Sequence, residues 1–266
     1  MKKLKLMLVM AAAIAFNSCS TVPLTGRSQL SLVSDDQINP AAAASYSQLL
    51  SSPSTKVISS GTDAQRVKRI GGQLATAIER YLQTNGYANQ YNFQWEFNLI
   101  QSADVNAFCM PGGKVAVYSG LLPVAQTDAG LAVVMGHEIG HAIARHSAER
   151  MSQELALQAG GTAVSAATGT KSSTTQALIG QLYGVGGQLA LLKYSRGQES
   201  EADRLGLTFM AMAGYDPNAA VGFWQRMAAQ NKGGAPPEFL STHPSDATRI
   251  ANLQKLIPEA MKYYKK

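Results

Sequence analysis

The chain has 266 residues, of which 45% are hydrophobic and 15% are charged, a composition that suits one folded domain and excludes disorder throughout. Its formal net charge of +6 is concentrated in lysines near the two ends, at residues 2–5 and 262–266. Because no basic stretch interleaved with aromatic residues lies between them, we expect no nucleic-acid partner.

Residues 1–18 have the order of a secretory signal peptide, with a basic start and an apolar stretch from Leu6 to Phe16 that is too short to span a bilayer. The sequence Phe16-Asn17-Ser18-Cys19-Ser20 resembles a bacterial lipoprotein processing site, although Phe16 stands where Leu is usual. We therefore predict that Cys19 is lipidated and anchors the chain to a membrane without a spanning helix. A plain signal peptide that is cut nearby is the alternative.

The next segments predict a tether and two helices. Residues 19–36 are polar, with Pro and Gly, and are predicted as a tether leading to one domain over 37–266. Residues 37–54 are rich in Ala and predicted to be helical. Apolar residues at spacings of three and four over 63–85 predict a second helix, which Gly86 ends.

Residues 91–118 change to the pattern of extended chain. Apolar and polar residues alternate from Tyr91 to Leu99, a second extended run covers 104–110, and Lys114–Tyr118 forms a third. Cys109 is the cysteine that remains if Cys19 carries lipid, so we expect no intrachain disulfide. With helices before and after these strands, the pattern predicts an α+β fold that is predominantly helical, with a small sheet.

The pentapeptide His137-Glu138-Ile139-Gly140-His141 follows an apolar run in a predicted helix over 127–150. Residues four apart share one helix face, so His137 and His141 can bind one zinc ion. Glu138 lies about 100° further around the helix, where it can act as the general base for the attacking water. A solvated face carrying His and Glu is the alternative, but burying these groups without a metal would be costly.

The third ligand is not expected from the same helix. A metzincin pattern fails because Ala144 and Ser147 stand where it requires Gly and His. His146 lies about 180° around the predicted helix from His137 and is assigned a structural or hydrogen-bonding role. Residues 155–192, rich in small residues, are predicted as a helical hairpin with a mobile tip near 168–175; a flexible flap is the alternative.

Glu199-Ser200-Glu201-Ala202-Asp203 lies on the next predicted helix and offers the third ligand. Glu199 can bind zinc, and Asp203, four residues later, can accept the free N–H of a ligand histidine, His137. Glu201 faces elsewhere and is interpreted as a salt-bridging or surface carboxylate. It would replace Glu199 as ligand if the helix were rotated.

His243 precedes a proline and has two interpretations. It is either an ordinary loop histidine or a residue over the metal, where it would serve as a reversible fourth ligand or as a donor to the developing oxyanion. Arg249 follows by six residues and is assigned a similar charge-stabilising role.

Short motifs spread in order along most of the mature chain carry a family resemblance. They are Pro23–Arg27, Val105–Phe108, Pro111–Gly113, Tyr118–Leu121, His137–His141, Ser195–Asp203 and Thr242–Pro244. Together they resemble the HtpX-like and CAAX-protease-like zinc metallopeptidases, specifically their periplasmic lipoprotein branch. The resemblance implies a gluzincin-type domain whose small sheet packs on the active-site helix, with one zinc ion per chain.

The resemblance also implies how substrates bind. The strand at 104–110 would be an edge strand whose Asn106, Ala107 and Phe108 contact an extended substrate backbone, and His243 would cap the zinc in a resting state. The implied substrates are unfolded, misfolded or damaged envelope proteins, at the periplasmic side of a bacterial membrane, the outer one by preference. Other envelope proteins are expected partners.

Two other functions compete with proteolysis. A metal-stabilised, membrane-anchored chaperone or assembly factor would keep the ligands but would not need Glu138. A structural lipoprotein would carry its histidines by coincidence, which the pairing of the His137–His141 and Glu199–Asp203 motifs disfavours.

Overall fold

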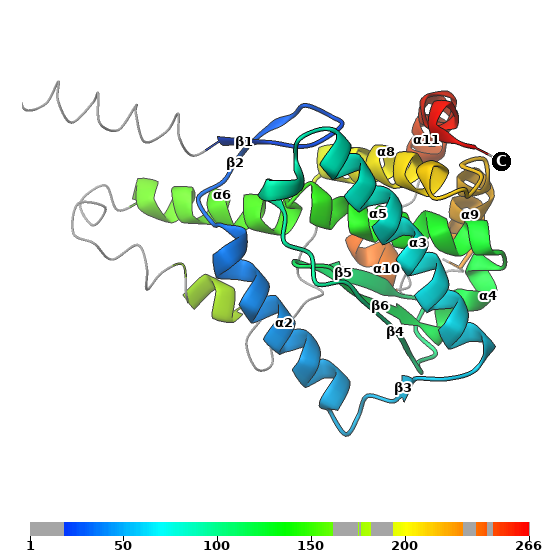
Figure 1. The fold of residues 1–266 in the computed structure, drawn as a ribbon. Helices are drawn as coiled ribbons and strands as arrows, with labels where there is room; N and C mark the ends of the chain where they lie inside the picture. The colour runs from blue at the N-terminus through cyan, green and yellow to red at the C-terminus, as the bar shows by residue number, and fades with distance from the viewer. Residues whose placement is uncertain are drawn as a thin grey trace, which may run out of the picture.

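Helices dominate the fold, and a four-stranded sheet packs against the helix that carries the His137–His141 sequence (Figure 1). The α+β, predominantly helical fold class is therefore confirmed. The predicted signal peptide and much of the segment 155–192, including residues 168–174 of its predicted tip, lie outside the described part of the chain. The computed structural model describes residues 19–161, 175, 177–181, 194–230, 238–243 and 247–265.

The chain enters the fold through a hairpin. Strand β1 (Cys19–Thr21) pairs antiparallel with β2 (Ser28–Leu30), and the backbone N–H of Val22 donates to the carbonyl of Arg27 across the turn. Val22 is fully buried in the main core. Residues 19–36 therefore pack onto the domain, which differs from the tether that their polar composition predicts.

The four-stranded sheet has the order β3-β4-β6-β5, with a parallel pair in its centre. β4 and β6 run parallel, whereas β3 with β4 and β5 with β6 are antiparallel. β5 is thus an edge strand of the described sheet, as the family resemblance implies. The strands are β3 (Val57–Ile58), β4 (Glu96–Ile100), β5 (Ala107–Met110) and β6 (Lys114–Tyr118).

The aromatic residues before β4 differ in detail from the prediction. The alternation predicts a strand from Tyr91, but β4 begins at Glu96. Tyr91, Phe93, Trp95 and Phe97 instead stack their rings in a row, with successive centroids 5.4, 4.4 and 6.0 Å apart. The alternation correctly predicts that these four rings lie on one side of an extended chain. The residues before Glu96 are extended without belonging to strand β4, and their rings stack on one another.

Helix α5 (Asp128–Ile143) lies between the sheet and helix α8 (Arg196–Met212), packing on β5 and β6 on one side and on α8 on the other. Helix α3 (Thr62–Thr84) packs on β4, α5 and α8. No helix among the described residues has both the length and the apolar character needed to cross a bilayer. Further helices in the described part of the chain include α2 (Asp35–Ser51), η1 (Ala88–Gln90), η2 (Ser119–Leu121), α4 (Leu122–Ala125), α6 (His146–Gly161), α9 (Ala219–Ala228), α10 (Glu238–Thr242), α11 (Ala247–Ala260) and η5 (Met261–Tyr263).

Glycines let α5 and α8 approach until their backbones touch. A Cβ atom at Gly206 would lie 2.7 Å from the backbone nitrogen of His137, and one at Gly140 would lie 2.8 Å from the carbonyl oxygen of Ala202. Both distances are shorter than a carbon can occupy beside backbone. The small residues therefore set the separation at which a side chain of α8 reaches the histidines of α5.

The helix that the sequence predicts over 127–150 is broken. α5 ends at Ile143 and α6 begins at His146, because Arg145 adopts a φ of 53°, in the left-handed region that ends a helix. The Arg145 guanidinium donates to Oδ2 of Asp35 at 2.7 Å, which holds the turn in place. The break returns His146 toward the pentapeptide instead of placing it on the opposite face of one helix.

Candidate metal centre

Helix α5 places two imidazoles in the interior. Its N-cap Thr127 accepts a hydrogen bond from the backbone of Gly130 at 3.1 Å, which fixes where the helix begins. His137 and His141 are 1% and 3% exposed, and their Nε2 atoms lie 3.1 Å apart. The spacing of four residues therefore brings both rings to one point, as the sequence predicts.

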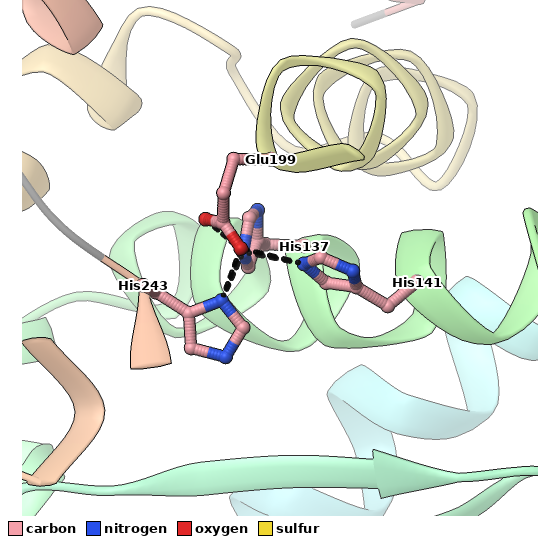
Figure 2. Close-up of side chains that lie close together, drawn as sticks. All are labelled: His137, His141, Glu199 and His243. Carbon is pink, nitrogen blue, oxygen red and sulfur yellow. Dashed lines mark hydrogen bonds and ion pairs between the residues drawn. The ribbon is translucent and has the colours of Figure 1, made fainter. Parts of the chain in front are cut away.

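Helix α8 supplies a carboxylate to the same point. Ser195 caps this helix in a capping box, so that Glu199 falls in its first turn and projects toward α5 (Figure 2). Its Oε1 lies 3.4 Å from Nε2 of His141, and its Oε2 lies 3.5 Å from Nε2 of His137. Burial alone would raise the pKa of the Glu199 carboxyl, but hydrogen bonds from the surrounding histidines outweigh burial and hold it well below its ordinary value.

His243 follows α10 and closes the cluster. Its Nδ1 lies 2.8 Å from Oε1 of Glu199 and 3.2 Å from Nε2 of His137 (Figure 2). The ring stacks on Phe239, with centroids 4.7 Å apart, and the residue is 4% exposed. Of the two interpretations of this histidine, the structure places it over the cluster and not in an exposed loop.

The distances among these groups fit a tetrahedral metal ion. Ligand atoms at about 2.0–2.1 Å from zinc lie about 3.3 Å from one another in a tetrahedron. The pairs described above are separated by 2.8–3.5 Å. The ligand atoms of His137, His141, Glu199 and His243 all lie within 4.8 Å of one another.

The charge of the site also fits a divalent cation. Glu138, Glu199 and Asp203 are buried carboxyl groups, and Arg249 is the buried guanidinium beside them. When the imidazoles are neutral and all three carboxyl groups are ionised, these four described residues carry a net charge of about −2. Buried charge without a partner is costly, and a doubly charged cation removes that cost.

Two residues hold His137 and Glu199 from outside the cluster. Nδ1 of His137 lies 2.9 Å from Oδ1 of Asp203, which is where the sequence predicts its outer acceptor. Arg249 donates to both oxygens of Asp203, at 2.7 and 2.9 Å, and lies 3.0 Å from Oε2 of Glu199. The guanidinium also sits 3.4 Å above the Trp224 ring. Arg249 is thus tied to the carboxylates that hold the site.

His146 and Glu201 lie on the other side of His141. The Nδ1 atoms of His141 and His146 are 2.8 Å apart, and Nε2 of His146 lies 3.0 Å from Oε2 of Glu201. Burial lowers the pKa of His146. Glu201 faces away from the ligand cluster and is 8% exposed, so it is a buried ion-pairing residue. Of the two forms of the first interpretation, the salt-bridging carboxylate is the one that the structure supports, although the side chain is buried. The ligand cluster contains Glu199 and not Glu201, so the alternative in which Glu201 replaces Glu199 does not hold.

Glu138 occupies the general-base position beside the cluster. Its Oε1 has no hydrogen-bond partner among the described residues and lies 3.6 Å from Nε2 of His243. Burial raises the pKa of Glu138 to about 7, against the opposing influence of His243 and of a hydrogen bond from the backbone of Cys109. Such a pKa lets one carboxyl group both accept and return a proton near neutral pH.

The open edge of β5 faces this carboxylate. The backbone N–H of Tyr118 donates to the carbonyl of Asn106, so Asn106 and Phe108 turn their backbone groups toward β6. Ala107 and Cys109 then turn theirs to the open edge, where Ala107 N–H meets Oδ1 of its neighbour Asn106. The structure therefore brings the predicted strand to the site, but it is Ala107 and Cys109 that turn their backbone groups to the edge that β6 leaves open.

Two aromatic residues of the site were missed in the sequence. The ring of Tyr194 stacks on His141, with centroids 4.0 Å apart and planes 22° from parallel. Trp224 packs edge-on against His137, with centroids 5.6 Å apart. Neither position carries a motif, since Tyr194 precedes a helix cap and Trp224 lies in an ordinary amphipathic helix, so neither could be found before the fold was known.

Comparison with known proteins agrees with this geometry. The model of Peptidase family M48 matches residues 65–257, a range that includes all four members of the cluster. The chain belongs to peptidase family M48. This confirms the resemblance to the HtpX-like metallopeptidases, and it makes the chain a metalloendopeptidase whose cofactor is zinc.

Relatives of this M48 chain include mitochondrial and bacterial proteases. Mitochondrial metalloendopeptidase OMA1 of Schizosaccharomyces pombe is 33% identical over 247 residues, which cover 92% of this chain and 68% of the relative. The OMA1 of Bos taurus is 32% identical over 93% of this chain and 47% of its own length. The beta-barrel assembly-enhancing protease of Escherichia coli is 30% identical over 62% of this chain and 35% of its own length. The chain thus spans less than half of the last two proteins.

Proposed function

We propose that this metalloendopeptidase cleaves unfolded or damaged proteins of the bacterial cell envelope, with His137, His141 and Glu199 as its zinc ligands and Glu138 as general base. The observation that carries the proposal is the near-tetrahedral spacing of the ligand atoms beside a buried carboxylate oxygen that has no hydrogen-bond partner in the described part of the chain. A site of two histidines and one glutamate with a fourth position that can open is the pattern of a catalytic zinc site.

The residues divide the chemistry among them. Bound zinc supplies a Lewis acid that polarises the scissile carbonyl and makes water acidic. Glu138 takes a proton from the attacking water and later returns it to the leaving amine. Asp203 and Arg249 keep His137 and Glu199 in place, so that the ligand positions do not have to reorganise during the reaction.

The β5 edge explains why unfolded chains would be preferred. Ala107 and Cys109 offer backbone groups to an extended peptide, which would add as a strand beside Glu138. A folded protein has its backbone groups already paired and cannot add in this way. The enzyme would thus choose substrates by the accessibility of their backbone more than by the identity of their side chains.

His243 gives the enzyme a resting state. With Nδ1 in the fourth position of the cluster and Nε2 toward Glu138, its ring fills the space that substrate carbonyl and water need. Cleavage then requires His243 to leave, after which the same ring could donate to the oxyanion from nearby. Arg249 would contribute to charge stabilisation through Glu199.

The proposed location is the periplasmic side of a bacterial membrane, with lipid on Cys19 as the anchor and other envelope proteins as partners. The order of residues 1–19 and the names of relatives from Vibrio cholerae and Escherichia coli, beta-barrel assembly-enhancing proteases, support it. Metabolic labelling with a palmitate analogue tests the anchor. Label on the wild type and none on Cys19→Ser is the expected result, and equal label on both would contradict it.

Casein cleavage by the mature domain, beside its Glu138→Gln variant, tests the reaction. We expect about one zinc per chain in both proteins and loss of cleavage by at least about a hundredfold in the variant. Zinc in both with cleavage in neither would favour the metal-stabilised chaperone or assembly factor. Zinc in neither would contradict the proposed site.

A further inference from the structure

A chain of hydrogen bonds leads from the N-terminal hairpin to His141. Oε1 of Glu201 accepts from the Thr25 hydroxyl at 2.5 Å, and its Oε2 accepts from Nε of Arg27 at 2.6 Å. The same Oε2 lies 3.0 Å from Nε2 of His146, whose Nδ1 lies 2.8 Å from Nδ1 of His141. His146 is fully buried, so its own contacts with Glu201 and His141 are shielded from solvent.

The order of donors along this chain decides which nitrogen of His141 is free. A carboxylate only accepts, so His146 donates from Nε2 to Glu201. A neutral His146 then has a bare Nδ1, which accepts from Nδ1–H of His141. His141 is left with a lone pair on Nε2, the atom that points into the ligand cluster. The reverse arrangement would put a proton on Nε2 of His141 and exclude metal.

Arg27 of the hairpin binds carboxylates on two helices, Glu201 on α8 and Glu149 on α6. Both terminal nitrogens of Arg27 donate to Glu149 on α6, at 2.7 and 3.0 Å, while its Nε binds Glu201 on α8. Figure 1 shows β1 and β2 lying beside the start of α8 and above α6. Arg27 therefore fixes Glu201 relative to the helix that begins with His146.

We propose that Thr25 and Arg27 of the hairpin are positioning residues for the zinc centre, acting on His141 through Glu201 and His146. The inference rests on the proposed ligand set. It gives residues 19–36, predicted as a tether, a function: the segment that follows the predicted lipid anchor also sets the tautomer and orientation of a metal ligand.

Zinc affinity, measured by chelator competition on the whole mature domain, tests the proposal. Arg27→Gln and Glu201→Gln should each raise the zinc Kd by about tenfold or more, as loss of an outer partner does in other metal sites. Glu259→Gln is the matched control, because it breaks the Arg204–Glu259 ion pair of α8 without touching the chain of bonds, and it should leave Kd within about twofold.

Two substitutions of His146 separate positioning from packing. In His146→Asn the Oδ1 atom takes nearly the place of Nδ1 and can still accept from His141, whereas His146→Leu fills space and accepts nothing. We expect Asn to keep zinc affinity within about threefold of the wild type and Leu to lose at least about tenfold. Adding Glu201→Gln to His146→Asn should then change little, because the link is already cut.

Equal zinc Kd values for the Asn and Leu variants, or for Arg27→Gln and Glu259→Gln, would overturn the inference while leaving the proposed function intact. A wild-type protein that binds no zinc would overturn both. Thermal unfolding of each metal-free variant identifies general loss of stability. A rise in zinc Kd that follows the loss in melting temperature, and not the presence of a hydrogen-bond acceptor at position 146, would also count against the positioning role.

Discussion

Nδ1 of His243 lies 2.8 Å from Oε1 of Glu199, so one imidazole binds the carboxylate that the site needs as a ligand. The contact brings together residues 44 positions apart in sequence and closes the fourth position of the cluster. A ring that leaves when substrate arrives would make resting activity low. The activity of this enzyme would then depend on the balance between two positions of a single side chain.

Replacing His243 by alanine tests that balance. If the capped state is favoured by about 1.4 kcal/mol, its removal should raise basal cleavage of casein about tenfold at saturating zinc. The double variant Glu138→Gln/His243→Ala should be inactive, which shows that the added cleavage uses the same site. A fall in cleavage with unchanged zinc content would instead identify His243 as the oxyanion donor.

The contact between α5 and α8 predicts a strong effect of one methyl group. Gly206→Ala would push Cβ to 2.7 Å from the backbone of His137, so α8 has to move away and take Glu199 with it. We expect a loss of about 1–3 kcal/mol in the free energy of unfolding, together with weaker zinc binding.

Gly72→Ala is the control for this change. Its Cβ would meet nothing within 4 Å in the middle of α3, so it should raise stability by about 0.5–1 kcal/mol without altering zinc affinity. Urea unfolding and chelator competition measure the two quantities. Similar results for Gly206→Ala and Gly72→Ala would contradict the close contact between the helices.

Asp203→Asn removes the charge that faces His137 and keeps the shape. The variant should lower zinc affinity by about 10–100-fold, because the outer acceptor of a ligand histidine becomes neutral and Arg249 loses one of its charged partners. Asp216→Asn, at a half-buried loop residue beyond α8 and outside the ligand cluster, is the control. Unchanged zinc affinity in Asp203→Asn would mean that Asp203 contributes to the stability of the fold and not to zinc binding.

The ion pairs of Asp128 predict that the stability of the fold depends on pH, whether or not zinc is bound. Hydrogen bonds from Arg69 and Arg66 lower its pKa below the ordinary value of 3.8, against slight burial. A carboxyl whose pKa is lowered on folding contributes stability above its unfolded pKa and loses it as pH falls through the folded pKa.

Asp128→Asn should therefore cost about 1 kcal/mol at pH 7, the size of an exposed ion pair at a helix N-terminus, and progressively less below about pH 4. Urea unfolding of the chelator-treated protein at several pH values measures this. Asp63→Asn, which opens α3 and has no ion pair among the described residues, should change stability less at pH 7. A cost for Asp128→Asn that stays constant down to pH 2 would refute the ion pair.

Local periodicity made part of the site predictable. His137 and His141 share a face because their spacing matches one helical turn, and that relationship holds wherever the helix lies. The same reasoning gave β6 its predicted bounds, and it put Asp203 one turn after Glu199. It failed at Arg145, where an ion pair with Asp35, 110 residues away, supports a break that no local pattern shows.

The sequence alone therefore determined the kind of chemistry, because a helical spacing of ligands and a general base are local properties. Only the tertiary structure decided which further residues serve it. The bonds of His146, Glu201 and Arg27 and the place of His243 depend on segments that lie far apart in the chain. Their contacts follow from packing between helices and a hairpin, which no local period encodes.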